Sequence, residues 1–306
     1  MDESTYANRY TEDEMGGTLF RQEEQIMQNK ICRYMLQWID ENIDTGLNIS
    51  DMSKMTGYSR RTLEFWFRKY YNMSPGHYLF LRKMTRAAFM LKLTIIPITE
   101  IAQLLHHSSN QSFAKAFKRF SGVTPTEYRN SKLWDLTILQ SSILFSDEKI
   151  TDVKVCVLKE RYLTGKSSFC LDSYLNFAKT KFLEILKKEV ITLMVSKKGD
   201  VCLSARPVML NDLSKNREGY VGVLMTIGIL ADAKTEETIL MPSGRFCRCH
   251  FCCDWSEYPF YTNMCFIKLM SENKFHFSGG DCYVHFFSIP EGITDWIECE
   301  LFIPIG

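Results

Sequence analysis

Two short stretches carry the residue types that bind a polyanion, and each reads as a basic helix. In Gly57–Asn72, GYSRRTLEFWFRKYYN, Ser59 can cap the helix, because its hydroxyl can accept from an unpaired N–H of the first turn. Apolar residues recur at helical spacing, and four basic residues lie off their stripe: Arg60, Arg61, Arg68 and Lys69. A second such helix is predicted at Ser109–Phe120, SNQSFAKAFKRF. Two basic helices of this kind predict DNA binding.

The formal net charge of +1 hides an uneven distribution along the chain. Residues 1–27 carry a net charge of −5, residues 28–132 carry +9 and residues 133–306 carry −3. Positive charge gathered in one block is the electrostatic footprint of a polyanion-binding module. The alternative is a basic domain that is merely well solvated.

The length and composition favour an ordered protein of two domains, each with its own core. The 306 residues are 45% hydrophobic, which argues against wholesale disorder. We find no run of roughly 18 apolar residues that would span a bilayer, and no apolar core of a signal peptide in the acidic N-terminal stretch. The eleven cysteines show no disulfide-like spacing, so we expect reduced thiols in a cytoplasmic protein.

The predicted helices form a duplicated arrangement. Residues 1–27 are polar and are expected to be a flexible extension, with the first helix at Lys30–Asn42. A short helix at Asn48–Thr56 ends at Gly57, which supplies the turn of a helix-turn-helix. A connector helix is predicted from Ser74–Pro75 to about Leu93.

The same pattern then recurs at an offset of 49 to 50 residues, as Ser59 and Ser109 or Phe67 and Phe117 illustrate. Matched caps and apolar positions predict two related units rather than two coincidentally similar hairpins. His106 takes the place of the first turn's glycine, so it must adopt a conformation that glycine adopts more cheaply. We expect His106 and the adjoining His107 to be structural, with a metal or pH role as the alternative.

Residues 28–130 resemble the DNA-binding domain of the AraC/XylS family of transcription regulators, and in particular its MarA, SoxS and Rob subgroup. The resemblance is carried by GYSRRTLEFWFRKYYNMSPGHYL and by FAKAFKRFSGVTPTEYR. It implies that two recognition helices on a rigid connector read two adjacent major grooves, about 34 Å apart, as a monomer on DNA. Double-stranded promoter DNA and RNA polymerase are the partners that it implies.

The resemblance also implies which side chains read the bases. Carried over, they are Arg61, Glu64 and Phe65 in the first unit, and Asn110, Gln111 and Lys115 in the second. Arg61 can pair with guanine, and Glu64 can accept from cytosine N4. Phe65 can pack on a thymine methyl group, and Gln111 or Asn110 can pair with adenine. The alternative for any one of them is contact with phosphate or solvent alone. Phosphate contacts are expected from five further residues: Arg60, Arg68, Lys69, Lys118 and Arg119.

Residues 150–306 lose the basic bias and gain strand-like runs, which predicts an α+β domain. The expected strands are Val153–Leu163, Tyr220–Leu230, Ser243–Cys253, Cys282–Ile289 and Trp296–Ile303, with helices at Asp172–Val190 and Glu257–Ser271. The pieces PSGRFCRCHF and CELFIPIG resemble the GyrI-like domain that binds small molecules. That resemblance implies an apolar or cationic effector, with Glu300 as the best candidate for its carboxylate partner and Trp255 and Tyr162 as walls. A structural role for Glu300 is the alternative.

Cysteine is concentrated on one predicted strand, at Cys247, Cys249, Cys252 and Cys253 beside His250. Thiolates and imidazole are good ligands for soft metals. However, His250 and Cys252 would face away from Cys247 and Cys249, so we expect small buried strand residues and no metal or other cofactor. A methyl-accepting DNA-repair enzyme is a remote alternative, because the local sequence is Arg-Cys-His-Phe and lacks the proline of that motif.

We therefore predict a two-domain, non-enzymatic transcription regulator, and more narrowly an activator. An all-α domain with two helix-turn-helix units joined by a connector helix spans 28–132, and a linker spans 133–149. An α+β GyrI-like domain at 150–306 would bind an effector or a protein partner. The alternative for this second domain is a scaffold that binds no ligand.

Overall fold

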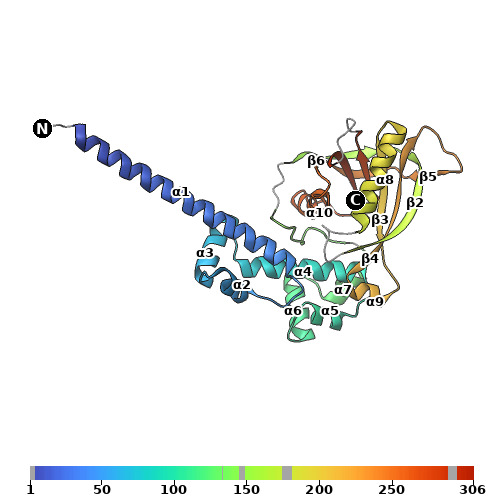
Figure 1. The fold of residues 1–306 in the computed structure, drawn as a ribbon. Helices are drawn as coiled ribbons and strands as arrows, with labels where there is room; N and C mark the ends of the chain where they lie inside the picture. The colour runs from blue at the N-terminus through green and yellow to red at the C-terminus, as the bar shows by residue number, and fades with distance from the viewer. Residues whose placement is uncertain (1–3, 133, 145–148, 174–180, 289–294) are drawn as a thin grey trace. The chain divides into compact units, whose positions relative to one another are not determined.

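The computed structural model describes the chain except residues 1–3, 133, 145–148, 174–180 and 289–294, and it leaves the side chains of 4–21 and 173 undescribed (Figure 1). The chain divides into two compact units, Met1–Phe80 and Leu81–Gly306, and each is described by itself. No helix in the described ranges is long and apolar enough to cross a membrane.

The first unit is helical and contains the first helix-turn-helix. Helix α1 (Ser4–Glu41) is followed by α2 (Ile49–Thr56) and α3 (Arg60–Tyr71), and α4 (Pro75–Leu93) begins in this unit. Met35, Ile39, Leu63 and Phe67 are fully buried in its core. Tyr78 closes this core, with its ring centroid 6.0 Å from that of Phe67.

Helix α1 begins at Ser4, so the helix start predicted at Lys30 was wrong. The residues before Lys30 are mostly polar and lack the apolar stripe on which the prediction relied. The Tyr70 hydroxyl of α3 donates to the backbone oxygen of Gln25 at 3.0 Å, which ties α1 to α3. That residues 1–27 form a separate flexible extension stays a prediction.

The second unit opens with the second helix-turn-helix. Helices α5 (Ile98–Leu104), α6 (Asn110–Ser121) and α7 (Pro125–Asn130) follow α4, whose predicted bounds are confirmed. Ile101, Phe113 and Phe117 are buried without exposed surface. Tyr128 of α7 packs edge-on against Phe117, with ring centroids 5.3 Å apart. Both halves of the predicted duplication therefore fold as paired short helices.

The rest of the second unit is an α+β domain built on one antiparallel sheet. Its strands are β1 (Ile150–Leu158), β2 (Arg161–Ser173), β3 (Val201–Val208), β4 (Tyr220–Ala231), β5 (Thr238–Met241), β6 (Gly244–Asp254), β7 (Cys282–Phe286) and β8 (Trp296–Pro304). They lie in the order β1-β6-β8-β7-β3-β4-β2-β5. The helical segments are α8 (Lys181–Lys197), α9 (Leu213–Arg217), α10 (Tyr258–Met264), η1 (Cys265–Leu269) and α11 (Met270–Glu272).

The strand predictions agree with the bounds of β4, β6 and β8 to within about two residues. The other strands were split, overextended or missed. The run predicted at Val153–Leu163 is two strands, because the chain breaks at Lys159–Glu160 between β1 and β2. Strands β3 and β5 were missed. Residues 172–173, predicted to begin a helix, end β2, and the described helix starts at Lys181. Leu175 and Ile289 of the predicted elements lie outside the described residues.

The two faces of the sheet have different surroundings. One face, here called the helix face, carries Cys249, Leu301 and Val284 and is packed by α10 and η1. The opposite face carries His250, Glu300 and Tyr283. Strands β1 and β5 form the two edges of the sheet, yet residues of both pack on one apolar cluster of the opposite face. The sheet therefore curls around the opposite face into a half barrel.

Candidate nucleic-acid interface and effector pocket

Helix α3 is fixed at both ends by the residues that flank it. The Ser59 hydroxyl accepts from the backbone N–H of Thr62 at 3.1 Å, which confirms the predicted cap. Asn72 ends the helix in the left-handed conformation, with φ of 55°. Leu63 and Phe67, four residues apart, point into the core from one face of α3, so the other side of the helix is turned toward solvent.

The predicted base-reading residues of α3 lie on its outer face. Arg61 is exposed, and Phe65 is exposed over 66% of its surface, which is high for an aromatic ring. Glu64 is half-buried and accepts from the Nε–H of Arg60 at 2.8 Å. Arg60, predicted to bind phosphate, is therefore already paired with a predicted base reader in the absence of DNA.

The other two predicted phosphate residues of α3 differ from each other. Arg68 is exposed at the last turn of the helix. Lys69 donates to the side-chain oxygen of Gln28 at 3.2 Å, and its ammonium lies 5.5 Å from the ring centre of Tyr70. Lys69 thus helps to hold α1 to α3, which the sequence pattern did not indicate.

Helix α6 repeats the construction of α3. Ser109 caps it by accepting from the N–H of Ser112 at 3.1 Å, and Gly122 ends it with φ of 81°. Residues 61–70 and 111–120 have the same sequence of exposed, half-buried and buried positions, one by one. All five DNA contacts predicted on α6 are exposed along one side of the helix: Asn110, Gln111, Lys115, Lys118 and Arg119. A shallow groove with Ser109, Gln111, Lys115 and Arg119 in its wall runs along this helix.

The turns before α3 and α6 differ as the sequence predicted. Gly57 has φ of 73°, and His106 has φ of 57°, so His106 takes the left-handed conformation that favours glycine. His107 donates its backbone N–H to the Ala102 oxygen at 2.9 Å, and its ring meets the Phe113 ring edge-on at 5.3 Å. Burial, and then the charge of Lys83, lower the pKa of His107. These contacts support the structural reading of His107.

An apolar cavity of about 260 Å³ lies on the helix face of the sheet. Leu203, Val223, Val284 and Leu301 form its floor. The walls are Phe182 of α8, Tyr258 of α10, Phe266 of η1, and Phe89 and Leu93 of α4. Among the described lining residues, Asp172 supplies the carboxylate, whereas Arg206 alternates with Ala205 and Pro207 on β3 and directs its guanidinium to the opposite face, where it pairs with Asp281 at 3.2 Å. A cavity with an apolar floor and few polar groups is suited to a small apolar molecule.

The three predicted pocket residues do not come together around this cavity. Glu300 neighbours Leu301 on β8 and therefore points to the opposite face, where Arg248 holds it at 3.0 Å. Trp255 is 3% exposed, stacks on Phe286 and packs against the tilted ring of Tyr258, one layer behind the cavity wall. Tyr162 lies at the start of β2 and donates its hydroxyl to Glu160. A role of these three in ligand binding stays a prediction.

Sequence reasoning missed Asp172, Phe182 and Tyr258 as cavity residues. Asp172 lies in a stretch predicted to be helical, so its place at the end of β2 was hidden. Phe182 and Tyr258 belong to helices whose packing on the sheet cannot be read from spacing. Tyr258 was nevertheless within the predicted helix Glu257–Ser271, and an aromatic residue near a helix start was the available signal.

Strand β6 divides its cysteines between the two faces, as predicted. Cys247, Cys249 and Cys253 are buried on the helix face, and burial raises the pKa of Cys253 to about 12. Cys249 is fully buried, so it cannot accept a methyl group from DNA in this conformation. Cys252 and His250 lie on the opposite face, where burial and then the Glu298 carboxylate raise the pKa of Cys252.

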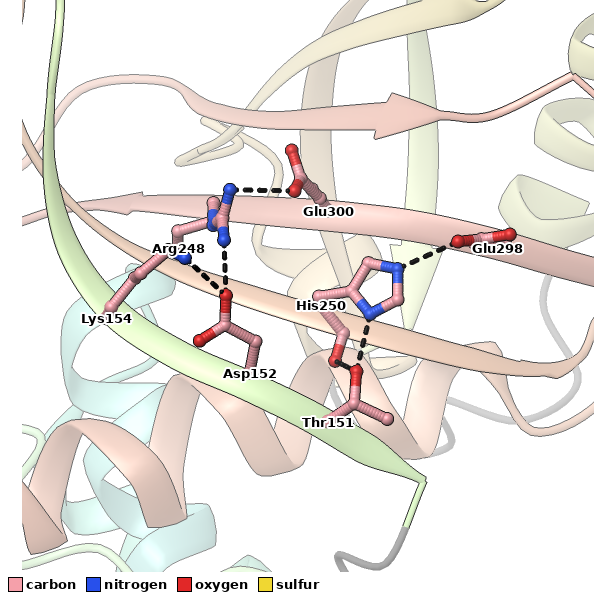
Figure 2. Close-up of polar contacts among 7 residues, drawn as sticks. All are labelled: Thr151, Asp152, Lys154, Arg248, His250, Glu298 and Glu300. Atoms are coloured by element: carbon pink, nitrogen blue, oxygen red, sulfur yellow. Dashed lines mark hydrogen bonds and ion pairs between the residues drawn. The ribbon is translucent and has the colours of Figure 1, made fainter.

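Polar side chains follow β1, β6 and β8 on the opposite face (Figure 2). Arg248 donates to Asp152 and pairs with Glu300, so it bridges the two outer strands of this group. His250 places Nε2 at 3.0 Å from the Glu298 carboxylate and Nδ1 at 2.6 Å from the Thr151 hydroxyl. Figure 2 shows the two groups side by side along β6. This polar row was not anticipated as a unit.

Comparison with known proteins identifies the family through the helical part of the chain. A family model described as a helix-turn-helix domain matches residues 52–131. The regulatory protein SoxS of Escherichia coli (strain K12) is 39% identical over 101 residues, which are 33% of this chain and 94% of SoxS. The chain belongs to the AraC/XylS family of transcription regulators. Its relatives in this family are DNA-binding regulators and not enzymes.

Other members of the AraC/XylS family extend the comparison only in part. The HTH-type transcriptional regulator YkgA of Escherichia coli (strain K12) is 33% identical over 145 residues, 47% of this chain. The chain spans 61% of the length of YkgA. For the curled sheet, the structure of SAV2435 bound to tetraphenylphosphonium matches 51% of this chain and 94% of that chain, at 8% identity and a TM-score of 0.34. This last likeness concerns the fold alone.

Proposed function

We propose that the chain is a transcription activator that reads two adjacent major grooves, one with α3 and one with α6, and recruits RNA polymerase there. The observation that carries the proposal is the identical exposure pattern of residues 61–70 and 111–120. Both helices bury two large apolar residues and present basic side chains outward, and α6 also presents the amides of Asn110 and Gln111. A helix of this kind fits the major groove and can hydrogen-bond to base edges.

Within this proposal the side chains divide into base readers and phosphate contacts. Arg61, Glu64 and Phe65 read bases from α3, and Asn110, Gln111 and Lys115 read them from α6. Glu64 accepts from cytosine while Arg60 holds its other oxygen, so Arg60 acts as a positioning residue as well as a phosphate contact. Arg68, Lys118 and Arg119 lie exposed at the last turns and contribute salt-sensitive affinity.

The first prediction separates the two kinds of contact on α3. Arg61→Ala should lower affinity for the preferred site by about 1–3 kcal/mol and relax the base preference at one position, because a bidentate arginine–guanine contact is lost. Arg68→Ala is the matched control, and it should weaken binding on all sequences alike and reduce the salt slope by about 1. Selection of bound sites from random DNA, followed by titrations at several salt concentrations, measures both quantities. Uniform weakening by Arg61→Ala would refute direct readout.

We propose further that the cavity of the α+β domain binds a small apolar effector. Its floor is aliphatic, and the Asp172 carboxylate at its wall favours a molecule that carries one positive charge. Phe89 and Leu93 of α4 belong to the same wall, and Arg217 of α9 pairs with Glu100 of α5, Nη2 to Oε2 at 2.8 Å. An effector in the cavity therefore touches the helix that leads to the second helix-turn-helix.

The second prediction tests which carboxylate serves the effector. Calorimetry with tetraphenylphosphonium, an apolar cation, should show binding that Asp172→Asn weakens and Glu300→Gln leaves unchanged. The neutral probe triphenylphosphine oxide should bind both variants as it binds the original chain. Weakening by Glu300→Gln alone would return the role to the residue predicted from the sequence. Absence of binding by both probes would favour a ligand-free scaffold.

A further inference from the structure

The opposite face of the sheet holds a cluster with metal-ligand chemistry that neither the recognition helices nor the cavity uses. His250 and Cys252 are two residues apart on β6, so their side chains point to the same side. Glu298 of β8 is the direct partner of Cys252 in the register. One ligand atom from each of the three residues lies within 4.8 Å of the other two.

We propose that His250, Cys252 and Glu298 bind one zinc-class divalent cation, with water at the fourth position. Around tetrahedral zinc, nitrogen, sulfur and oxygen ligands lie about 3.3–3.6 Å apart. The Nε2 of His250 is already 3.0 Å from the Glu298 carboxylate, and the Cys252 sulfur lies within 4.8 Å of both ligand atoms, so a shift of the sulfur by about 1 Å or less completes the set. A soft thiolate with an imidazole selects zinc-class ions over magnesium or calcium.

The surroundings of the cluster support a ligand role for His250. Its Nδ1 is 2.6 Å from the Thr151 hydroxyl, which leaves Nε2 as the coordinating nitrogen. An outer partner of this kind fixes the ring orientation of metal-bound histidines. The Phe287 ring lies 6.1 Å from the imidazole and shields one side of it. All three ligand residues are half-buried, so a cation can reach them from solvent.

The charges also balance. Binding forms a sulfur–metal bond at Cys252 and releases the thiol proton to solvent. The resulting thiolate and the Glu298 carboxylate neutralise a divalent ion. Arg248, the nearest cation along β6, is held by Asp152 and Glu300, so its charge is already compensated.

The test uses the reduced, untagged full-length chain and Co²⁺ as a spectroscopic substitute for Zn²⁺. One equivalent of Co²⁺ should produce thiolate-to-cobalt charge transfer and the intense visible bands of tetrahedral cobalt, and Zn²⁺ should displace it. Cys252→Ser should abolish the charge-transfer band, and Glu298→Gln should weaken binding. Thr151→Val should weaken binding by about 10-fold to 100-fold, because it removes the outer partner of His250.

Two matched controls sharpen the experiment. His285 forms a similar pair with Asp200 at 3.0 Å, and Cys170 is a half-buried thiol on β2. His285→Gln and Cys170→Ser should leave cobalt binding unchanged, and near-ultraviolet circular dichroism should show that all variants are folded. The proposal is overturned if no stoichiometric binding occurs, if Cys252→Ser retains the charge-transfer band, or if a control variant loses it.

Discussion

At the scale of single residues, the turns before α3 and α6 are each set by one backbone conformation. Gly57 and His106 have φ of 73° and 57°, and a side chain in this left-handed region crowds the following carbonyl. No heavy atom lies within 4 Å of the position that a Cβ at Gly57 would take, so the cost of a side chain there is conformational and not steric packing. The two helix-turn-helix units therefore form the same turn, but the backbone strain is greater at His106 than at Gly57.

The third prediction is a reciprocal exchange at these two positions. His106→Gly should raise the free energy of unfolding by about 1 kcal/mol, because the left-handed strain is removed. Gly57→His should lower it by a similar amount. Chemical denaturation of both variants measures the effect. If His106→Gly destabilises the fold, contacts of the imidazole outweigh its backbone strain.

Residue types indicated the outward-facing readers but not their local partners. The helical spacing of Leu63 and Phe67 was enough to place Arg61 and Phe65 outside. The spacing of Arg60 and Glu64 also permits their pairing, because residues four apart are neighbours on a helix. The contact of Lys69 with Gln28 joins residues 41 apart, so it follows only from packing of α1 on α3.

At the scale of elements, the junction of α5 and α6 contains a partly buried titratable ring. His107 packs on Phe113, and burial followed by the charge of Lys83 lowers the pKa of its imidazole. The unfolded chain therefore binds a proton more readily than the folded chain. The folded chain therefore loses stability as the pH falls below about 6.5, the usual pKa of a histidine in an unfolded chain. The loss ends once the pH is below the lowered pKa of His107 in the folded chain.

The fourth prediction follows from that difference. His107→Phe keeps an aromatic ring against Phe113 but cannot take up a proton. The loss of stability between about pH 7 and pH 5.5 should be smaller in this variant than in the original chain. Urea denaturation at the two pH values measures the loss, and the exposed His276→Gln serves as the control. An equal loss in His107→Phe would place the pH dependence elsewhere.

Helices with an apolar stripe and a capping residue were predicted closely, as α2, α3, α4 and α6 demonstrate. Their signals are local. Strand β3 was missed because it contains Arg206 and Pro207 and lacks clean alternation, although four of its residues are buried. The break between β1 and β2 was also missed, since the two flanking runs are equally strand-like and only their distant partners distinguish them.

At the scale of the whole molecule, the duplication and the α+β class were visible in the sequence, but the cavity was not. Its floor combines β3, β4, β7 and β8, and its walls come from helices on both sides of those strands in the chain. No spacing rule joins residues so far apart. The predicted boundaries at 28–132 and 150–306 stay predictions, because the two compact units divide at Phe80 and Leu81, inside α4.

The strand order determines when each part of the chain can fold during its synthesis. Strands β1 and β2 are consecutive, yet β1 pairs with β6 at one edge and β2 lies near the other, between β4 and β5. On the ribosome β1 must wait for a partner synthesised much later, whereas each helix-turn-helix closes through local contacts and folds quickly. The cavity floor is complete only when Leu301 of β8 has emerged. A chain interrupted during synthesis would already carry both folded helix-turn-helix units but would lack the finished cavity.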